Sequence, residues 1–159
     1  MPKLQTIAIT TAGTTALTAM LSGFKAYASI SDDNLDAMLT DLLTQAVLKV
    51  QEFADTAIVA TQLKLTATPG ARSGRVLLYQ GGGTVASVTA EDGTTSVDYT
   101  AIAANVLEVA VRTPVVVSYT TVPLAGEVAR LTPTVYRYAS ALYDGAATDE
   151  LNRILNEVL

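Results

Sequence analysis

The segment from Ser31 to Phe53 constrains the fold more than any other part of this 159-residue chain. Asp32 and Asp33 suit a helix N-terminus, where free backbone N–H groups and the helix dipole favour carboxylates. The segment predicts one long α-helix over residues 32–55, whose apolar stripe other elements must cover. Apolar residues recur in it at spacings of three and four, as one face of a helix requires: Leu35, Leu39, Leu42, Leu43, Ala46, Val50 and Phe53.

Two shorter elements are expected before the long helix. Residues 3–10 alternate roughly between apolar and polar side chains, which predicts a short strand or an extended arm within residues 1–12. Apolar residues at helical spacing over 14–27 predict a first helix, which Gly23 weakens or ends. Polar residues interrupt any apolar core of a signal peptide here, so none is expected.

The middle of the chain, residues 58–121, predicts a small antiparallel β-sheet or barrel. Short alternating segments follow one another there, with turn signals every 8 to 12 residues. The C-terminal part predicts two further helices. The first begins with Thr132 as N-cap and Pro133 in the first turn, and the second lies within residues 146–159. The fold class is therefore α+β: one domain over 1–159, built as a helical bundle with a β-insertion.

Charge and composition exclude several kinds of function. The net charge of −5 argues against a module that grips DNA, because such a module needs a basic face. The chain has no cysteine and no histidine, so the commonest zinc ligands and the commonest general base are missing. No apolar run approaches the length of a membrane span. We expect no enzyme activity, no cofactor, no metal and no membrane partner.

Four clusters suggest chemistry, and each has a simpler interpretation. Asp32, Asp33 and Asp36 could hold a metal, but their place at a helix start explains them. The three consecutive glycines at 81–83 resemble a phosphate-binding loop only superficially, since no Lys-Ser or Lys-Thr follows them. The Glu-Asp-Gly sequence at 91–93 indicates a turn. Tyrosines near 140 could stack on nucleic acid, but burial of two and a rim position for the third fit the acidic balance better: Tyr136 and Tyr143 buried, Tyr138 at the rim.

With these elements in place, the chain resembles the head–tail connector (adaptor) proteins of tailed bacteriophages. The resemblance rests on DDNLDAMLTDLLTQAVLKVQEFAD at 32–55, GGGTVASVTAEDG at 81–93, VLEVAV at 106–111, VVVSYTT at 115–121 and the helix with tyrosines that begins at Thr132-Pro133. It covers nearly the whole chain from about residue 13. Its motifs are patterns of apolar and turn residues, not catalytic signatures.

The resemblance implies a ring of identical subunits in the virion neck. Such a ring, twelve-fold in expectation, docks beneath the portal protein, joins the next neck or tail protein and surrounds a channel through which DNA passes without specific binding. The subunits would be made in the host cytoplasm. An alternative is a tail-completion or terminator ring, or a capsid-associated binding module.

Three sets of residues are candidates for the contacts of this ring. The long helix would present a channel-facing or subunit-contacting set: Asp36, Asp41, Gln45 and Lys49. The strand at 115–121 would offer an edge that pairs with a neighbouring subunit, because an unpaired edge is a template for another strand: Val115, Val117 and Tyr119. The C-terminal tail would dock into the portal through its apolar residues: Leu151, Ile154, Leu155 and Val158.

Overall fold

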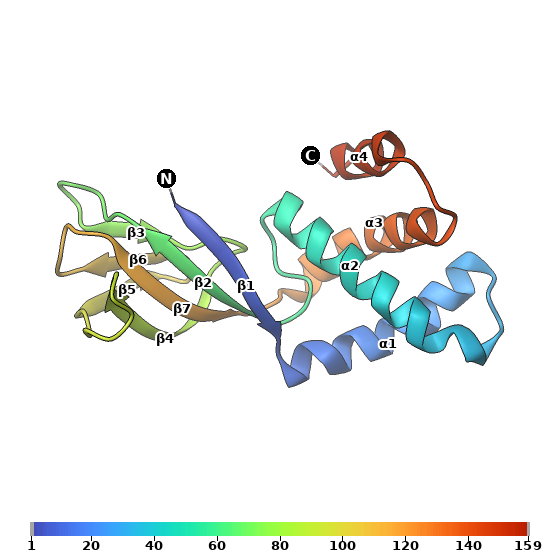
Figure 1. Cartoon of the computed structure of the whole chain (residues 1–159), viewed down its shortest axis with the longest axis horizontal. Helices are drawn as coiled ribbons and strands as arrows, with labels where there is room; N and C mark the ends of the chain where they lie inside the picture. Colours follow the sequence, from blue (N-terminus) through green and yellow to red (C-terminus); the bar gives the residue numbers. More distant parts are fainter. Residues whose placement is uncertain (1, 159) are drawn as a thin grey trace. The chain divides into compact units, whose positions relative to one another are not determined.

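The computed structural model describes residues 2–158, which group into two compact units. One unit, here called the β unit, joins the residues up to Thr10 to Ala60–Val122. The other, here called the helical unit, joins Thr11–Val59 to the chain from Pro123 on (Figure 1). The predicted α+β class is confirmed. The predicted β-insertion thus belongs, with the N-terminal segment, to a unit that has its own core.

The β unit contains two antiparallel sheets that share one apolar core. The four-stranded sheet has the order β1-β2-β7-β4 and the three-stranded sheet the order β3-β6-β5. Alternation along TQLKLTA in β2 buries every second residue, as one covered sheet face requires. The core draws side chains from both sheets, including Leu63, Leu65, Val117, Val76 and Leu107. The strands are β1 (Lys3–Ile9), β2 (Thr61–Ala67), β3 (Arg75–Leu77), β4 (Gly83–Ala90), β5 (Tyr99–Ala103), β6 (Val106–Val109) and β7 (Val115–Thr121).

The N-terminal segment is a strand, so the alternative of an extended arm over residues 1–12 is wrong for Lys3–Ile9. β1 pairs with β2 along its length, with Lys3 opposite Thr66, and carries a bulge between Thr6 and Ala8. Pairing in the sheet satisfies backbone groups that a free arm would leave to water. The chain then turns directly into the first helix at Thr11.

Strand β7 lies in the middle of its sheet, so the prediction that residues 115–121 offer an intersubunit edge is wrong. β7 pairs with β2 on one side and with β4 on the other. Val115, Val117 and Tyr119 are all buried, with exposed fractions of 0–1%. The physical reason is composition: VVVSYTT is apolar enough to be covered on both its edges and its inner face.

The helical unit is built around the predicted long helix. A single 3-10 turn, η1 (Asp33–Leu35), leads into α2 (Asp36–Ala54), and the Asp32 carboxylate accepts the N–H of Asn34 at 2.9 Å. Asp55 ends the helix in the left-handed conformation, with φ 49°. α2 packs against α1 and α3, and α4 packs against α3. The other helices are α1 (Thr11–Ala28), α3 (Ala125–Tyr143) and α4 (Thr148–Asn156).

Two helix boundaries differ from the sequence prediction. α1 continues through Gly23 to Ala28. Packing favours a residue without a side chain at position 23, because a Cβ there would lie 2.4 Å from the hydroxyl oxygen of Tyr136. α3 begins at Ala125, seven residues before Thr132, and therefore holds Pro133 in its interior. The Thr132 hydroxyl donates to the Val128 carbonyl at 2.6 Å, so it bonds within the helix and is not its N-cap.

The positions predicted for the tyrosines of α3 are partly wrong. Tyr138 is buried, and Tyr143 is 41% exposed. The buried stripe of α3 runs through Leu131, Val135 and Tyr138, and this spacing leaves Tyr143 outside it. Tyr136 lies beside the stripe, with its ring centroid 6.0 Å from that of Phe24 and 5.8 Å from that of Tyr27.

Candidate functional site

The exposed face of α2 holds three of the four residues predicted to line a channel or meet a neighbour. Asp41, Gln45 and Lys49 are four residues apart and exposed, and Glu52 continues the same stripe. Neither Asp41 nor Lys49 forms an ion pair with a described residue. The stripe therefore presents one cation and two carboxylates to whatever it meets.

Asp36 does not belong to that face, because it bonds to α1. The Lys25 ammonium group lies 2.6 Å from Asp33 Oδ1 and 2.7 Å from Asp36 Oδ1. The two carboxylates raise the pKa of Lys25, Asp33 more than Asp36, and the Lys25 hydrogen bond lowers the pKa of Asp33. This clamp joins the C-terminal turn of α1 to the start of α2. Among the described residues, no group of three or more acidic, His or Cys side chains is arranged to hold a metal.

The apolar residues of α4 mostly face inward. Ile154 and Leu155 are 3% and 1% exposed, whereas Leu151 and Val158 are half-buried. Ion pairs of Arg137 and Arg153 with Glu157 tie the end of α4 to α3 and to its own preceding turn. Packing on α3 covers Ile154 and Leu155, which leaves Leu151 and Val158 as the partly accessible members of the predicted portal-docking set. Docking of this segment into the portal stays a prediction.

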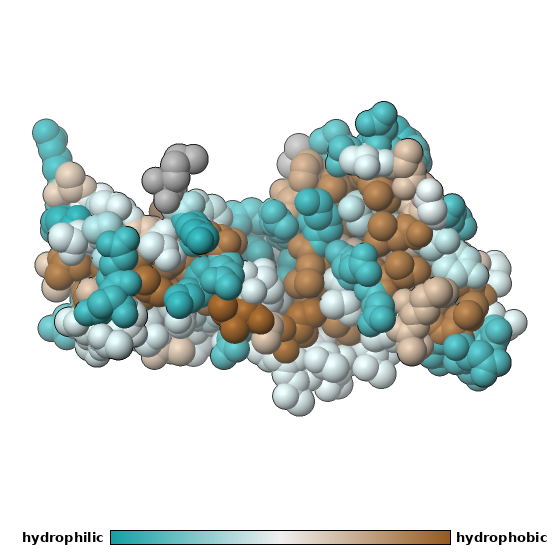
Figure 2. Space-filling view, in the orientation of Figure 1, coloured by the Kyte–Doolittle hydropathy of each residue, from teal (hydrophilic) through white to brown (hydrophobic). Residues whose placement is uncertain are grey.

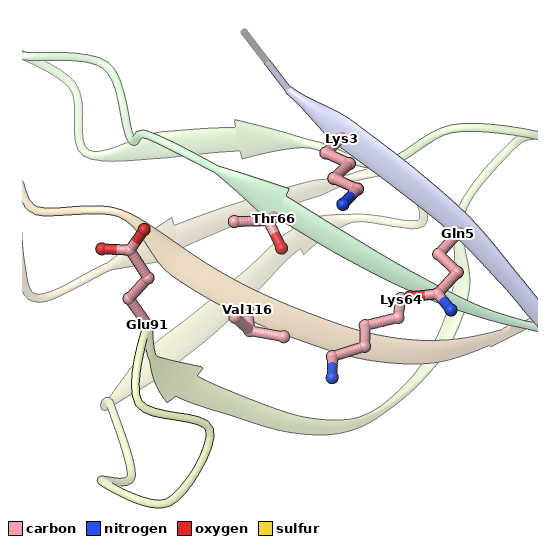
Figure 3. Close-up of a pocket in the computed structure, with 6 residues that line it drawn as sticks. All are labelled: Lys3, Gln5, Lys64, Thr66, Glu91 and Val116. Carbon is pink, nitrogen blue, oxygen red and sulfur yellow. The ribbon is translucent and has the colours of Figure 1, made fainter.

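The outer face of the four-stranded sheet is polar. Lys3 and Gln5 from β1 lie over this face with Lys64 and Thr66 from β2, and Glu91 approaches from the turn after β4 (Figure 3). Together with Val116 they line a shallow hollow of about 370 Å³. Its two ammonium groups, carboxylate, amide and hydroxyl suit polar groups and not an apolar ligand.

The four edge strands of the two sheets differ in whether other backbone groups of the chain bond to their outer side. The outer edge of β4 is covered by residues 95–97: Val97 N–H donates to the Val88 carbonyl at 2.9 Å, and Ala90 N–H donates to the Thr95 carbonyl at 2.8 Å. The outer edge of β3 is covered by the turn before it, where Gly70 N–H donates to the Arg75 carbonyl and Arg75 N–H to the Ser73 hydroxyl. β1 and β5 have no such cover among the described residues.

The turns of the β unit explain two motifs that suggested chemistry. Asp92 accepts the backbone N–H groups of Thr94 and Thr95 and the Thr95 hydroxyl, at 2.6–2.9 Å. These bonds, with the Thr95 hydroxyl first, lower the pKa of Asp92 to about 2. Gly82 has φ 72°, and a Cβ there would lie 2.0 Å from the Ala104 carbonyl oxygen. Both motifs are therefore turns.

Charge is divided unequally between the units. The β unit contains five Lys and Arg and four Asp and Glu residues, a net +1, whereas the helical unit contains five and eleven, a net −6. On the face in view, hydrophilic residues gather over α4, with hydrophobic residues next to them on the same unit (Figure 2). The net negative charge of the chain thus comes from the helical unit alone.

The sequence did not reveal two of the bonds that organise these surfaces. Tyr119 extends from β7 to the second residue after β3, where its hydroxyl accepts the Tyr79 N–H at 3.0 Å and donates to the Tyr79 carbonyl at 3.1 Å. Buried Gln51 accepts the Ile58 N–H at 3.2 Å beyond the end of α2. In the sequence, the only sign of these two hydrogen-bonding side chains is a polar group within an apolar pattern. Such a sign does not identify the partner of the bond.

Comparison with known proteins finds likeness in solved structures alone. No protein-family model and no curated protein matches the chain. A chain in the neck of an empty GTA particle, computed with C6 symmetry, is 16% identical, with a TM-score of 0.63 over 98% of this chain and 94% of that one. A chain in the neck of the native GTA particle, computed with C12 symmetry, is 15% identical, with a TM-score of 0.57 over 97% and 94%.

A third similar chain comes from the virion of a native gene transfer agent (GTA) particle, with 15% identity and a TM-score of 0.60 over 97% of this chain and 93% of that one. At such identities the likeness establishes the fold. It extends over both units, and it confirms at the level of the fold the resemblance to connector proteins of phage-like necks. Separately, none of the helices in residues 2–158 is long and apolar enough to cross a membrane.

Proposed function

We propose that this chain is a structural subunit of the neck of a phage-like particle. In this proposal identical copies form a closed ring, twelve-fold, between the portal protein and the next neck or tail protein. DNA passes through the ring without specific binding. The chain carries no catalytic activity, and its copies are made in the host cytoplasm before they join the virion.

The observation that carries this proposal is the fold likeness, which covers 97–98% of this chain. The similar chains occur in necks computed with six- and twelve-fold symmetry. The charge distribution supports the same function. A helical unit of net −6 repels phosphates at short range, which suits a conduit that must release its cargo.

The direct test is to remove the gene product from the particles that carry it. We expect heads that fill with DNA but fail to retain it or to join tails, and a density for the missing ring at the portal vertex when the chain is restored. Electron microscopy of labelled particles gives the position and the number of copies. A label at the far end of the tail or over the capsid surface would favour the tail-completion or capsid-module alternative, and normal tail joining would contradict the proposal.

A further inference from the structure

Two strand edges of the β unit are left open by the chain itself. β1 and β5 each pair on one side only, and within residues 2–158 no turn or loop bonds to the other side. The remaining two edges are covered in part: that of β3 at Arg75 by residues 70–73, and that of β4 at Val88 and Ala90 by residues 95–97. The two edges that the chain leaves open for their full length are therefore the sites for another strand.

β5 has only one of the features that usually protect an edge, a bulge. Its sequence, YTAIA, has no charged residue and no proline, and all five residues are exposed. Tyr99 is 40% exposed and Ile102 is 47% exposed, although each is large and apolar. A single bulge between Ala101 and Ala103 interrupts the strand. Covering this edge would remove apolar surface from water as well as satisfy backbone groups.

The register shows which backbone groups of β5 are available. Ala110 N–H donates to the Asp98 carbonyl, and the ladder continues with Tyr99 opposite Val109. Because hydrogen-bonded pairs alternate in an antiparallel ladder, Thr100 directs its N–H toward β6, whereas Tyr99 and Ala101 direct theirs outward. The outward edge therefore has donors and acceptors at Tyr99 and Ala101.

β1 offers a complementary edge on the same unit. It is seven residues long against five for β5, its only charge is Lys3, and its bulge residue Ile7 is 51% exposed. Pairing of β1 with β5 would bring no like charges together. A closed ring needs head-to-tail contacts, in which each copy uses two different surfaces. Two different open edges on one unit meet that requirement.

We propose that the open edge of β5 pairs with the open edge of β1 from the adjacent copy of this chain. The inference rests on the ring of the proposed function and names its contact. The three-stranded sheet of one copy and the four-stranded sheet of the next would then form one seven-stranded sheet at each contact of the ring. Ile7, Tyr99 and Ile102 would lie at this contact.

Cross-linking in the full-length protein tests the pairing. The natural chain has no cysteine, so single substitutions give a clean background. Proteins carrying Gln5→Cys or Thr100→Cys are treated with a short bis-maleimide, alone and as an equal mixture. We expect cross-linked pairs mainly in the mixture, about ten-fold above either protein alone, because the contact joins β1 to β5. Dimers from Thr100→Cys alone would show β5 pairing with itself, and cross-links in neither case would overturn the proposal.

A backbone substitution provides an independent test. Ala101→Pro removes one outward N–H and no bond to β6, as proline tolerates in an edge strand, and Ala101→Ser keeps the N–H as the matched control. We expect Ala101→Pro to weaken association about ten-fold per contact, measured by sedimentation and by the ring fraction in electron micrographs, with an unchanged circular dichroism spectrum. Normal rings from a folded Ala101→Pro protein would overturn the β5 contact but leave the ring function standing. If the wild-type protein forms no ring, either free or in particles, the proposed function itself fails.

Discussion

Single residues account for the features of this chain that first suggest a ligand. The acidic start of the long helix is explained by Lys25, whose ammonium group bonds to Asp33 and Asp36 across the turn between α1 and α2. Sequence spacing predicts the capping function of Asp32 but not this cation, which lies eight residues before Asp33 and in another helix. Nothing further is required to explain why three carboxylates gather there.

Asp92 gives the clearest titration prediction at this scale. Its pKa of about 2 lies below the ordinary 3.8, so its bonds stabilise the folded turn above pH 3.8 and are lost as the pH falls through about 2. Thr95→Val removes the strongest of these bonds and should raise the pKa of Asp92 toward 3.8, as seen by carboxyl-carbon NMR. Thr94→Val, whose hydroxyl contributes least, is the control and should leave the titration nearly unchanged. If Thr95→Val left the titration midpoint of Asp92 unchanged, this would contradict the hydrogen bond between the Thr95 hydroxyl and Asp92.

Among the elements, helix α1 contains a glycine, Gly23, at a position where helix propensity alone would favour alanine. Alanine in a helix is favoured over glycine by about 1 kcal/mol. At Gly23, however, a Cβ would lie 2.4 Å from Tyr136 Oη and 3.2 Å from Cζ. The rings of Phe24 and Tyr27 and a long hydrogen bond of 3.4 Å to the Met20 carbonyl restrain Tyr136. Close packing of α1 on α3 thus decides this position.

We therefore expect Gly23→Ala to destabilise the protein and Tyr136→Phe to relieve most of that loss. The double variant should be about 1 kcal/mol more stable than the sum of the single effects, because the phenylalanine lacks the nearest atom. Urea unfolding of the four proteins of the cycle measures the coupling. A stabilised Gly23→Ala variant in the Tyr136 background would show that the tyrosine moves aside freely.

For the whole molecule, the unequal charge of the two units matters more than the total of −5. In the proposed ring, α2 is the candidate to face DNA, and its exposed carboxylates are Asp41 and Glu52. Asp36 is unsuited to this test because its replacement would break the Lys25 clamp. The sequence pattern grouped Asp36 with Asp41 because both are polar. In the helix the two residues lie on different faces.

Replacing Asp41 and Glu52 with lysine tests the channel assignment. We expect stability to change by less than about 0.5 kcal/mol, since both side chains are exposed. Particles carrying this variant should release DNA more slowly at low salt and recover at high salt, because lysines that contact phosphates bind in a salt-dependent way. Asp144→Lys with Asp149→Lys gives the same charge change at two exposed residues outside α2 and serves as the control. Equal release by both variants at every salt concentration would remove α2 from the channel wall.

Local sequence patterns predict the order of elements, the α+β class and the long helix with its acidic start. These depend on local periodicity, capping and turn chemistry, which neighbouring residues specify. They also predict the antiparallel β-structure between residues 58 and 121, where β2 to β7 lie, because alternation and turns are local signals.

Long-range packing fixes which strand is central, which carboxylates are paired and which tyrosine is buried. Val115, Val117 and Tyr119 show why: an apolar strand is equally suited to an open edge that awaits a partner and to a place between two strands of its own chain. Pairing with β2 and β4 depends on residues 25 to 58 positions away, and local pattern carries no information about them. The open edges at β1 and β5, and with them the proposed contact between copies, follow from that long-range pairing.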